Sequence, residues 1–278
     1  MSNSMKFAHA YDPSTPVEAS TYSRSPKNLG ELFKLAQEGA TVRDIRSPLS
    51  PASTPTLACT NGVWVIDTPN IQKMLCREDI VELRGLCYFH RSVFLAGGCL
   101  LDWAHGARER DVDVYWQQNV SLATRAAHKV AEKVGRMIKS PETVHLDLHS
   151  PEQEYKRLSA LLTVSRMMSG TTPVDFCVLR RAASSRSLVE GFDSDLGKLW
   201  TGFNMFGVLA HPDAALAMLT GVAHIYTRTR NAFPRTEDDK VLFMKQERKE
   251  KLVEKYTAYG YKVLEVVEPF LTGESEDE

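Results

Sequence analysis

The stretch of sequence that decides the fold is VFLAGGCLLDWAHGARERDVDVY, residues 93–115. Its start belongs to the apolar run SVFLAGG (92–98), which predicts a buried strand that ends in a glycine pair. The following CLLDWAHG (99–106) predicts a short helix that Gly106 ends. A strand that passes through two glycines directly into a helix therefore forms the centre of the expected fold.

The end of this stretch carries a pair of carboxylates. DVDVYW (111–116) alternates polar and apolar residues, which predicts a strand with Asp111 and Asp113 on one face. The glycine pair, Gly97 and Gly98, allows backbone N–H groups to approach an anion closely at a helix start. Paired carboxylates suit Mg²⁺, which binds a few carboxylates together with substrate phosphates. The combination indicates metal-assisted phosphoryl or nucleotidyl transfer.

Outside this stretch, strand and helix patterns alternate along the chain. Further strands are expected at 62–67, 143–150, 160–168 and 173–180, and helices at 29–39, 69–89 and 121–139. The order predicts an α/β fold, with a mixed sheet and helices packed on it.

Composition divides the chain into four parts. The first sixty residues hold 6 of the 13 prolines, with 9 Ser and 6 Thr, and predict an extended arm over 1–60. The α/β domain is expected over 61–186, and a smaller, helical C-terminal region over 187–270. The last residues, 271–278, are acidic and predict a solvated tail.

The overall numbers exclude several classes of protein. With 278 residues, 43% hydrophobic and 25% charged, the chain is long and apolar enough to bury a core, so it is not wholly disordered. A balance of 34 basic and 35 acidic side chains excludes nucleic-acid binding by bulk charge alone. No apolar run is long enough for a membrane span, and the N-terminus lacks a secretory signal. Five cysteines without a CxxC motif predict reduced thiols in a cytoplasmic protein.

The segment 92–180 resembles the nucleotidyltransferase superfamily that includes DNA polymerase beta. It is most similar to the head domain of the poly(A) polymerase and CCA-adding group, and it is also similar to nucleotidyltransferase-like proteins of bacteriophage genomes. That pattern has an apolar strand, a glycine pair, a short helix with an Asp, a Gly, and then two Asp residues that alternate with apolar ones. Here the residues are Gly97, Gly98, Asp102, Gly106, Asp111 and Asp113.

The resemblance implies a third carboxylate on a later strand, and PVDFCVL supplies Asp175. It implies a nucleotidyltransferase-type mixed sheet and transfer of a nucleoside monophosphate from an NTP, such as ATP, with release of pyrophosphate. Asp111, Asp113 and Asp175 would be the catalytic ligands of two Mg²⁺ ions, with Mn²⁺ as an alternative metal. Gly97, Gly98 and Asp102 would bind the nucleotide. Leu101 stands where the family pattern usually has a basic residue.

The implied acceptor is an RNA 3′ end, because the nearest resemblance is to RNA-tailing enzymes. Two other functions stay open: transfer to a protein or a small molecule, and a non-catalytic module that binds nucleotide or RNA. The expected location is the cytoplasm, which would be the host cytoplasm for a phage-encoded protein.

Four other groups of residues each have two interpretations. His145, Asp147 and His149 are interpreted as the polar face of a strand rather than a zinc site, and His211-Pro-Asp213 as the start of a helix. Asp193 and Asp195 either cap a helix or reach the site, with Lys198 one helical turn further on as a triphosphate contact. The segment 228–262 holds ten Lys/Arg, six Asp/Glu and interleaved tyrosines, and is either a surface for single-stranded nucleic acid or a solvated helix face.

Overall fold

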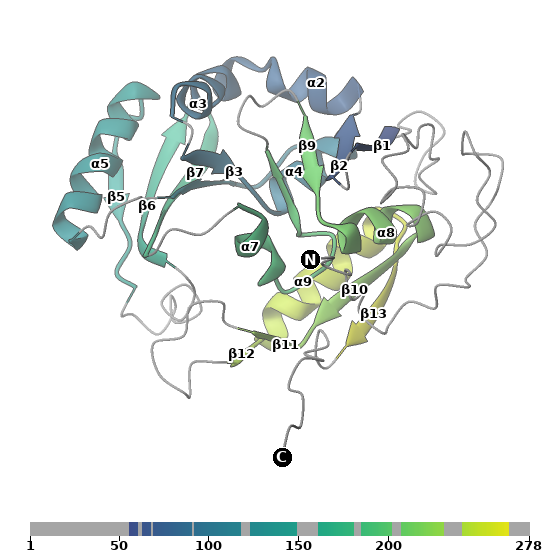
Figure 1. Cartoon of the computed structure of the whole chain (residues 1–278). Helices are drawn as coiled ribbons and strands as arrows, with labels where there is room; N and C mark the ends of the chain where they lie inside the picture. The colour runs from purple at the N-terminus through teal and green to yellow at the C-terminus, as the bar shows by residue number, and fades with distance from the viewer. Residues whose placement is uncertain are drawn as a thin grey trace, which may run out of the picture.

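The computed structural model describes residues 56–60, 63–67, 69–90, 92–117, 123–148, 161–180, 185–201, 207–230 and 241–266. The helix predicted at 29–39, most of the predicted arm and the acidic tail lie outside these residues. The described chain has a mixed α/β fold, as the sequence predicts (Figure 1). Among the helices described, none is both long and apolar enough to cross a membrane.

A five-stranded mixed sheet forms the centre of the fold. Its strands, in spatial order, are β3 (Val93–Leu95), β4 (Val112–Trp116), β7 (Thr172–Leu179), β6 (Leu161–Ser169) and β5 (Thr143–His145). β4 and β7 are parallel, and every other neighbouring pair is antiparallel. A tight turn at Gly170 joins β6 to β7, with Ser169 and Thr172 as register partners.

The period-two pattern of β4 and β7 gives the sheet two different faces. Val114 and Phe176 point to one face and join a core that includes Ala127 and Leu83 from the helices α5 (Thr124–Met137) and α3 (Glu78–Phe89). The alternate residues of the same strands, Asp113 and Asp175 among them, point to the opposite face. In Figure 1, α3 and α5 lie on the outer side of the sheet and α7 lies on the inner side.

The stretch 69–89 forms two helices where the pattern predicts one. α2 (Pro69–Leu75) ends before Arg77, and α3 begins after it. Arg77 has extended backbone angles, φ −64° and ψ 141°, and its side chain bonds to Asp79 and Glu109. This long-range anchoring favours a break that local periodicity does not reveal.

A second, four-stranded sheet links distant parts of the chain. It contains β1 (Thr56–Thr60), β2 (Val63–Asp67), β9 (Val208–Ala210) and β8 (Leu199–Thr201), all antiparallel. A bridge between Ala96 and Trp200 connects this sheet to the end of β3. The last five residues of the predicted arm and part of the predicted C-terminal region are therefore integral to one fold.

The region after residue 186 contains strands as well as helices. Its helices are the end of α7 (Ser185–Glu190), α8 (Pro212–Thr220) and α9 (Gln246–Ala258). Besides β8 and β9, it has the parallel pair β10 (Val222–Tyr226) and β13 (Lys262–Val266), and the antiparallel pair β11 (Arg228–Arg230) and β12 (Val241–Phe243). Strands of three to five residues are too short for their periodicity to be recognised in the sequence.

Candidate active site

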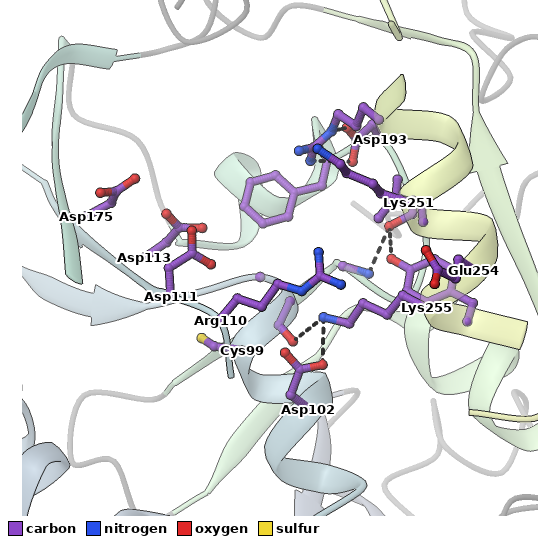
Figure 2. A pocket seen from close by; sticks show the side chains of 18 of the residues that line it. Cys99, Asp102, Arg110, Asp111, Asp113, Asp175, Asp193, Lys251, Glu254 and Lys255 are labelled. Carbon is purple, nitrogen blue, oxygen red and sulfur yellow. Dashed lines mark hydrogen bonds and ion pairs between the residues drawn. The ribbon is translucent and has the colours of Figure 1, made fainter. Parts of the chain in front are cut away.

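Two carboxylates meet at the inner face of the central sheet. Asp113 on β4 and Asp175 on β7 are direct partners in the parallel register, so their Cα atoms lie one strand spacing apart, about 4.8 Å. Asp111 immediately precedes β4 and is exposed. Figure 2 shows the three side chains on one side of a pocket. The structure thus brings together the three predicted catalytic residues.

Asp175 is held by an arginine from the neighbouring strand. Arg166 on β6 is its register partner, and the guanidinium donates to both carboxylate oxygens, Nε to Oδ1 at 2.8 Å and Nη2 to Oδ2 at 2.9 Å. The hydrogen bonds to Asp175 raise the pKa of Arg166, and the charges of Asp111 and Asp113 add to this effect. The guanidinium therefore lies in the electrostatic field of all three carboxylates.

The carboxylates face a cavity of about 720 Å³, a size typical of small-molecule sites. Its floor carries Gly97 and Gly98, and its far wall is α9. Six cationic side chains line the cavity: Arg108, Arg110, Lys245, Arg248, Lys251 and Lys255. The wall at α9 carries four of these cations and two carboxylates, Glu247 and Glu254, so an acidic wall faces one in which cations are in excess.

The wall formed by α9 presents its cations at helical spacing. Lys251 pairs with Glu247 one turn away, at 2.6 Å, and Arg248 pairs with Asp193. Tyr256 fixes the helix from its buried side, because its hydroxyl lies 2.6 Å from the Ser194 hydroxyl. The basic, tyrosine-containing segment of the sequence is thus part of the pocket rather than only a solvated face.

The glycine pair is placed where the sequence predicts, with one difference. Gly97 is the N-cap of α4 (Gly98–Ala104) and has φ 95° and ψ −152°, a conformation essentially restricted to glycine. Its N–H donates to the Leu199 carbonyl at 2.9 Å, so this amide is used within the fold and does not face an anion. Gly97 contributes the shape of the turn, and the backbone of Gly98 lines the pocket.

Replacement of Gly97 by alanine tests this role. We expect Gly97→Ala to lower the free energy of unfolding by about 2 kcal/mol, because any side chain is strained at this φ and ψ. Gly85→Ala is the matched control: Gly85 lies inside α3 with no atom near the added methyl group, so alanine should stabilise by about 1 kcal/mol. Urea denaturation of both variants measures these effects, and equal stabilities would contradict the strained turn.

Asp102 connects α4 to α9. Its carboxylate is buried and accepts hydrogen bonds from Tyr259 Oη and Lys255 Nζ, each at 2.6 Å. Burial raises the pKa of Asp102, and the Lys255 charge opposes that rise. Lys255 also donates to the Gly98 carbonyl at 3.1 Å. Asp102 thus holds a cation of α9 beside the glycine turn, and this contact explains how a predicted nucleotide-binding residue belongs to the pocket.

Two other titratable groups near the turn are kept neutral. Burial, with the charges of Asp113 and Asp102, raises the pKa of Cys99 well above its usual value, so this thiol stays protonated and is a poor nucleophile. Burial, with the Lys255 charge, lowers the pKa of His105 to about 4. The charges that face the cavity at neutral pH are therefore those of the carboxylates and the six cations.

The helix-cap interpretation of Asp193 and Asp195 and the triphosphate role of Lys198 are wrong, whereas Asp193 lines the cavity, as the alternative interpretation predicts. Asp193 and Asp195 do not cap a helix: the chain continues into β8, Asp193 pairs with Arg248, and Asp195 accepts from the backbone and ring of His224. Lys198 is only 3% exposed and does not line the cavity. Its ammonium lies 2.6 Å from Asp213, which makes it part of a buried ion pair rather than a triphosphate contact.

The histidine motifs have structural roles. His211 is the N-cap of α8 and accepts from the Asp213 N–H at 3.2 Å, as the helix-start interpretation predicts. His145 on β5 lies 2.8 Å from the Ser165 hydroxyl and stacks on His128. His149 lies outside the described residues.

The donor chemistry of the acidic wall suits a hard divalent cation. Carboxylate oxygens are the ligands of Mg²⁺, which takes one or two of them together with substrate phosphates. Within the described ranges, no three His, Cys, Asp or Glu side chains are arranged to hold a metal ion by themselves. Asp111 and Asp113 fit an ion whose remaining ligands come from substrate, whereas Asp175 is bound to Arg166.

No motif in the sequence identifies Arg110, Arg166 or the individual cations of α9 as site residues. Arg166 could have been noticed as a lone charge within the apolar strand pattern LLTVSRMM. Arg110 is adjacent to Asp111 and was hidden by the run RER. The contact between α9 and the glycine turn joins residues 157 positions apart, so no local pattern reveals it.

No family model matches this sequence, and no curated protein sequence matches it. Several solved structures resemble it at low identity. One is a CCA-adding enzyme in complex with ATP, with 14% identity, a TM-score of 0.45 and coverage of 70% of this chain and 41% of that chain. The Thermotoga maritima CCA-adding enzyme complexed with tRNA shows 16% identity, a TM-score of 0.38 and coverage of 56% and 35%.

A third solved structure is a tRNA-processing enzyme in an apo form, with 16% identity, a TM-score of 0.38 and coverage of 54% of this chain and 37% of that chain. This chain spans less than half of the length of each of the three proteins.

Proposed function

We propose that this protein is a divalent-cation-dependent nucleotidyltransferase. It transfers a nucleoside monophosphate from an NTP to an acceptor hydroxyl and releases pyrophosphate. The observation that carries the proposal is the pairing of Asp113 with Asp175 on one wall of a cavity whose opposite wall carries an excess of cations. Such a cavity can hold a polyanion and a divalent cation at the same time.

In this mechanism Asp111 and Asp113 would hold Mg²⁺ or Mn²⁺, and Asp175 would complete the acidic set for a second ion. The metal, when bound, neutralises charge on the phosphates and lowers the pKa of the attacking hydroxyl. The chain's own residues orient the reactants: the glycine turn shapes the floor beside Asp113, and Asp102 holds Lys255 over Gly98. No protein nucleophile is required, which agrees with the protonated Cys99 thiol.

The basic side of the cavity is the proposed place of the triphosphate. Lys255 is three-quarters buried and rests between Gly98 and Asp102. Arg110 projects into the pocket between the carboxylates and α9 (Figure 2). Arg110 forms no hydrogen bond or ion pair with any residue of the described structure. Its five donors are therefore available to phosphate oxygens.

Arg110→Gln tests the triphosphate contact. We expect the KM for NTP to rise about tenfold, because a charge-assisted hydrogen bond to phosphate contributes about 1.5 kcal/mol or more. The melting temperature should not change, because Arg110 supports no other described residue. Arg136→Gln, an exposed change at the end of α5 and outside the cavity lining, is the control. A KM equal to that of the wild type would contradict this role of Arg110.

The preferred acceptor is an RNA 3′ end. Its support is the exposed cations around the rim of the cavity, Arg108, Lys245 and Lys251, which can neutralise backbone phosphates next to the acidic wall. Tyr259 lines the same cavity and adds an aromatic ring to its lining. The tRNA in one of the solved structures that resemble this chain is in keeping with this acceptor.

The experiment uses the four α-labelled NTPs separately, with Mg²⁺ and total cellular RNA, and resolves the products on a denaturing gel. Wild-type protein runs beside Asp111→Ala/Asp113→Ala. We expect label in RNA with the wild type only, and RNA affinity that falls steeply with salt. Pyrophosphate release without labelled RNA would replace RNA by a protein or small-molecule acceptor. NTP binding without turnover under any condition would contradict the proposed function and favour a binding module.

A further inference from the structure

The acidic site contains a built-in cation. Arg166 reaches Asp175 from the neighbouring strand, and the Arg166 side chain is half exposed, whereas the Asp175 side chain is 2% exposed. Each carboxylate oxygen of Asp175 accepts one hydrogen bond from the Arg166 guanidinium. A buried carboxylate needs such a partner, because an unpaired charge in this position is costly.

The Arg166–Asp175 pair explains why the backbone brings three aspartates together and their side chains still do not form a metal site. Asp113 and Asp175 lie in register on adjacent parallel strands, and Asp111 is two residues from Asp113. Even so, the described side chains form no metal-holding group of three. The Asp175 carboxylate is turned to Arg166, so the acidic wall is arranged for a guanidinium.

The Arg166–Asp175 ion pair is also placed so that a divalent cation can replace Arg166 as the partner of Asp175. A divalent cation carries twice the charge of a guanidinium on a much smaller radius. Arg166 is half exposed and can turn to solvent, and the entering divalent cation would then be the charge partner of the buried Asp175 carboxylate. Asp175 lines the cavity, so an ion that enters next to Asp113 meets it directly.

We propose that Arg166 is the counter-cation of the acidic site: it holds Asp175 when no divalent cation is bound, and a divalent cation competes with it for the Asp175 carboxylate. The inference rests on the proposed function for the identity of the ion. It makes Arg166 a positioning residue that sets metal affinity rather than a catalytic residue.

The test is Mn²⁺ binding, measured by electron paramagnetic resonance on the full chain without nucleotide. Arg166→Gln removes the competing charge, and we expect the Kd for Mn²⁺ to fall about tenfold, the lower end of the effect of an adjacent charge on a carboxylate. Arg136→Gln, the exposed control on α5, should bind as the wild type does. The double variant Arg166→Gln/Asp175→Asn should lose the increase in Mn²⁺ affinity, because it lacks the carboxylate that the removal of Arg166 makes available to the ion.

Arg166→Lys provides a second variant, because it keeps the charge and loses the two-pronged hold. It should bind Mn²⁺ with a Kd between those of the wild type and Arg166→Gln, and it carries the test if Arg166→Gln does not fold. Mn²⁺ binding that is unchanged or weaker in the Arg166 variants, or absent from all proteins, overturns the inference. NTP turnover is measured in parallel: turnover with unchanged Mn²⁺ affinity contradicts the inference alone, and tighter Mn²⁺ binding without turnover contradicts the proposed function alone.

Discussion

Asp113→Asn should reduce nucleotidyl transfer by about a thousandfold or more, because the metal contributes several kcal/mol to the transition state and about 1.4 kcal/mol corresponds to tenfold in rate. Asparagine has nearly the same volume as aspartate but no charge. The Asp113 side chain lies between Gly97 and strand β7, so the substitution removes the negative charge at the centre of the acidic wall. The measurement is the initial rate of label transfer at saturating NTP.

Two controls separate loss of chemistry from loss of fold. Asp147→Asn makes the same change at an exposed residue outside the cavity lining and should leave the rate unchanged. Circular dichroism melting of Asp113→Asn should remain close to that of the wild type, because the substitution keeps the strand and its packing. A rate within tenfold of the wild type would show that Asp113 does not hold the metal.

Arg77→Met should lower the free energy of unfolding by about 3–5 kcal/mol, the cost of breaking a buried ion pair from one side. Arg77 donates to Glu109 at 2.7 Å, and the Glu109 side chain is fully buried. Trp103 Nε1 donates to the same oxygen at 2.7 Å. Methionine fills the space but leaves Glu109 without its cation. Chemical denaturation measures the loss.

The acid side of the stability curve gives an independent check. Burial alone would raise the pKa of Glu109, but hydrogen bonds from Arg77 and Trp103 lower it below its usual value. Its contribution to stability is therefore present above the usual glutamate pKa and is lost as the pH falls through the folded value. Arg77→Met should flatten that decline, whereas Arg84→Met, on α3 and half-buried, should not. If Arg77→Met lowers the free energy of unfolding by less than about 1 kcal/mol, the Arg77–Glu109 pair contributes no more than an ordinary surface ion pair.

The sequence predicts those parts of the site that local patterns specify. Alternation in DVDVYW identifies the strand and the face of Asp113, and the glycine pair identifies the turn into α4. Asp175 follows from the family resemblance and lies opposite Asp113 in the structure. The strand and the glycine turn depend on neighbours within a few residues along the chain.

The parts of the site that the sequence does not predict depend on long-range contacts. Helical spacing predicts that Lys198 reaches the site, but no helix follows Asp195, and the lysine turns inward to Asp213. The cavity wall formed by α9 exists because Lys255 and Tyr259 meet Asp102 across more than 150 residues. The packing of sheets and helices decides which distant side chain each cation contacts, and a local sequence pattern does not specify that packing.

The central claim is that a divalent cation and an NTP triphosphate meet between Asp113 and α9. The most direct measurement is a crystal structure of the full chain with Mn²⁺ and a non-transferable NTP analogue, with data collected at the Mn absorption edge. We predict an anomalous peak in direct coordination to the Asp113 carboxylate, with the triphosphate between it and Lys255. A metal ion that does not touch Asp113, or a triphosphate bound outside this cavity, would contradict the account.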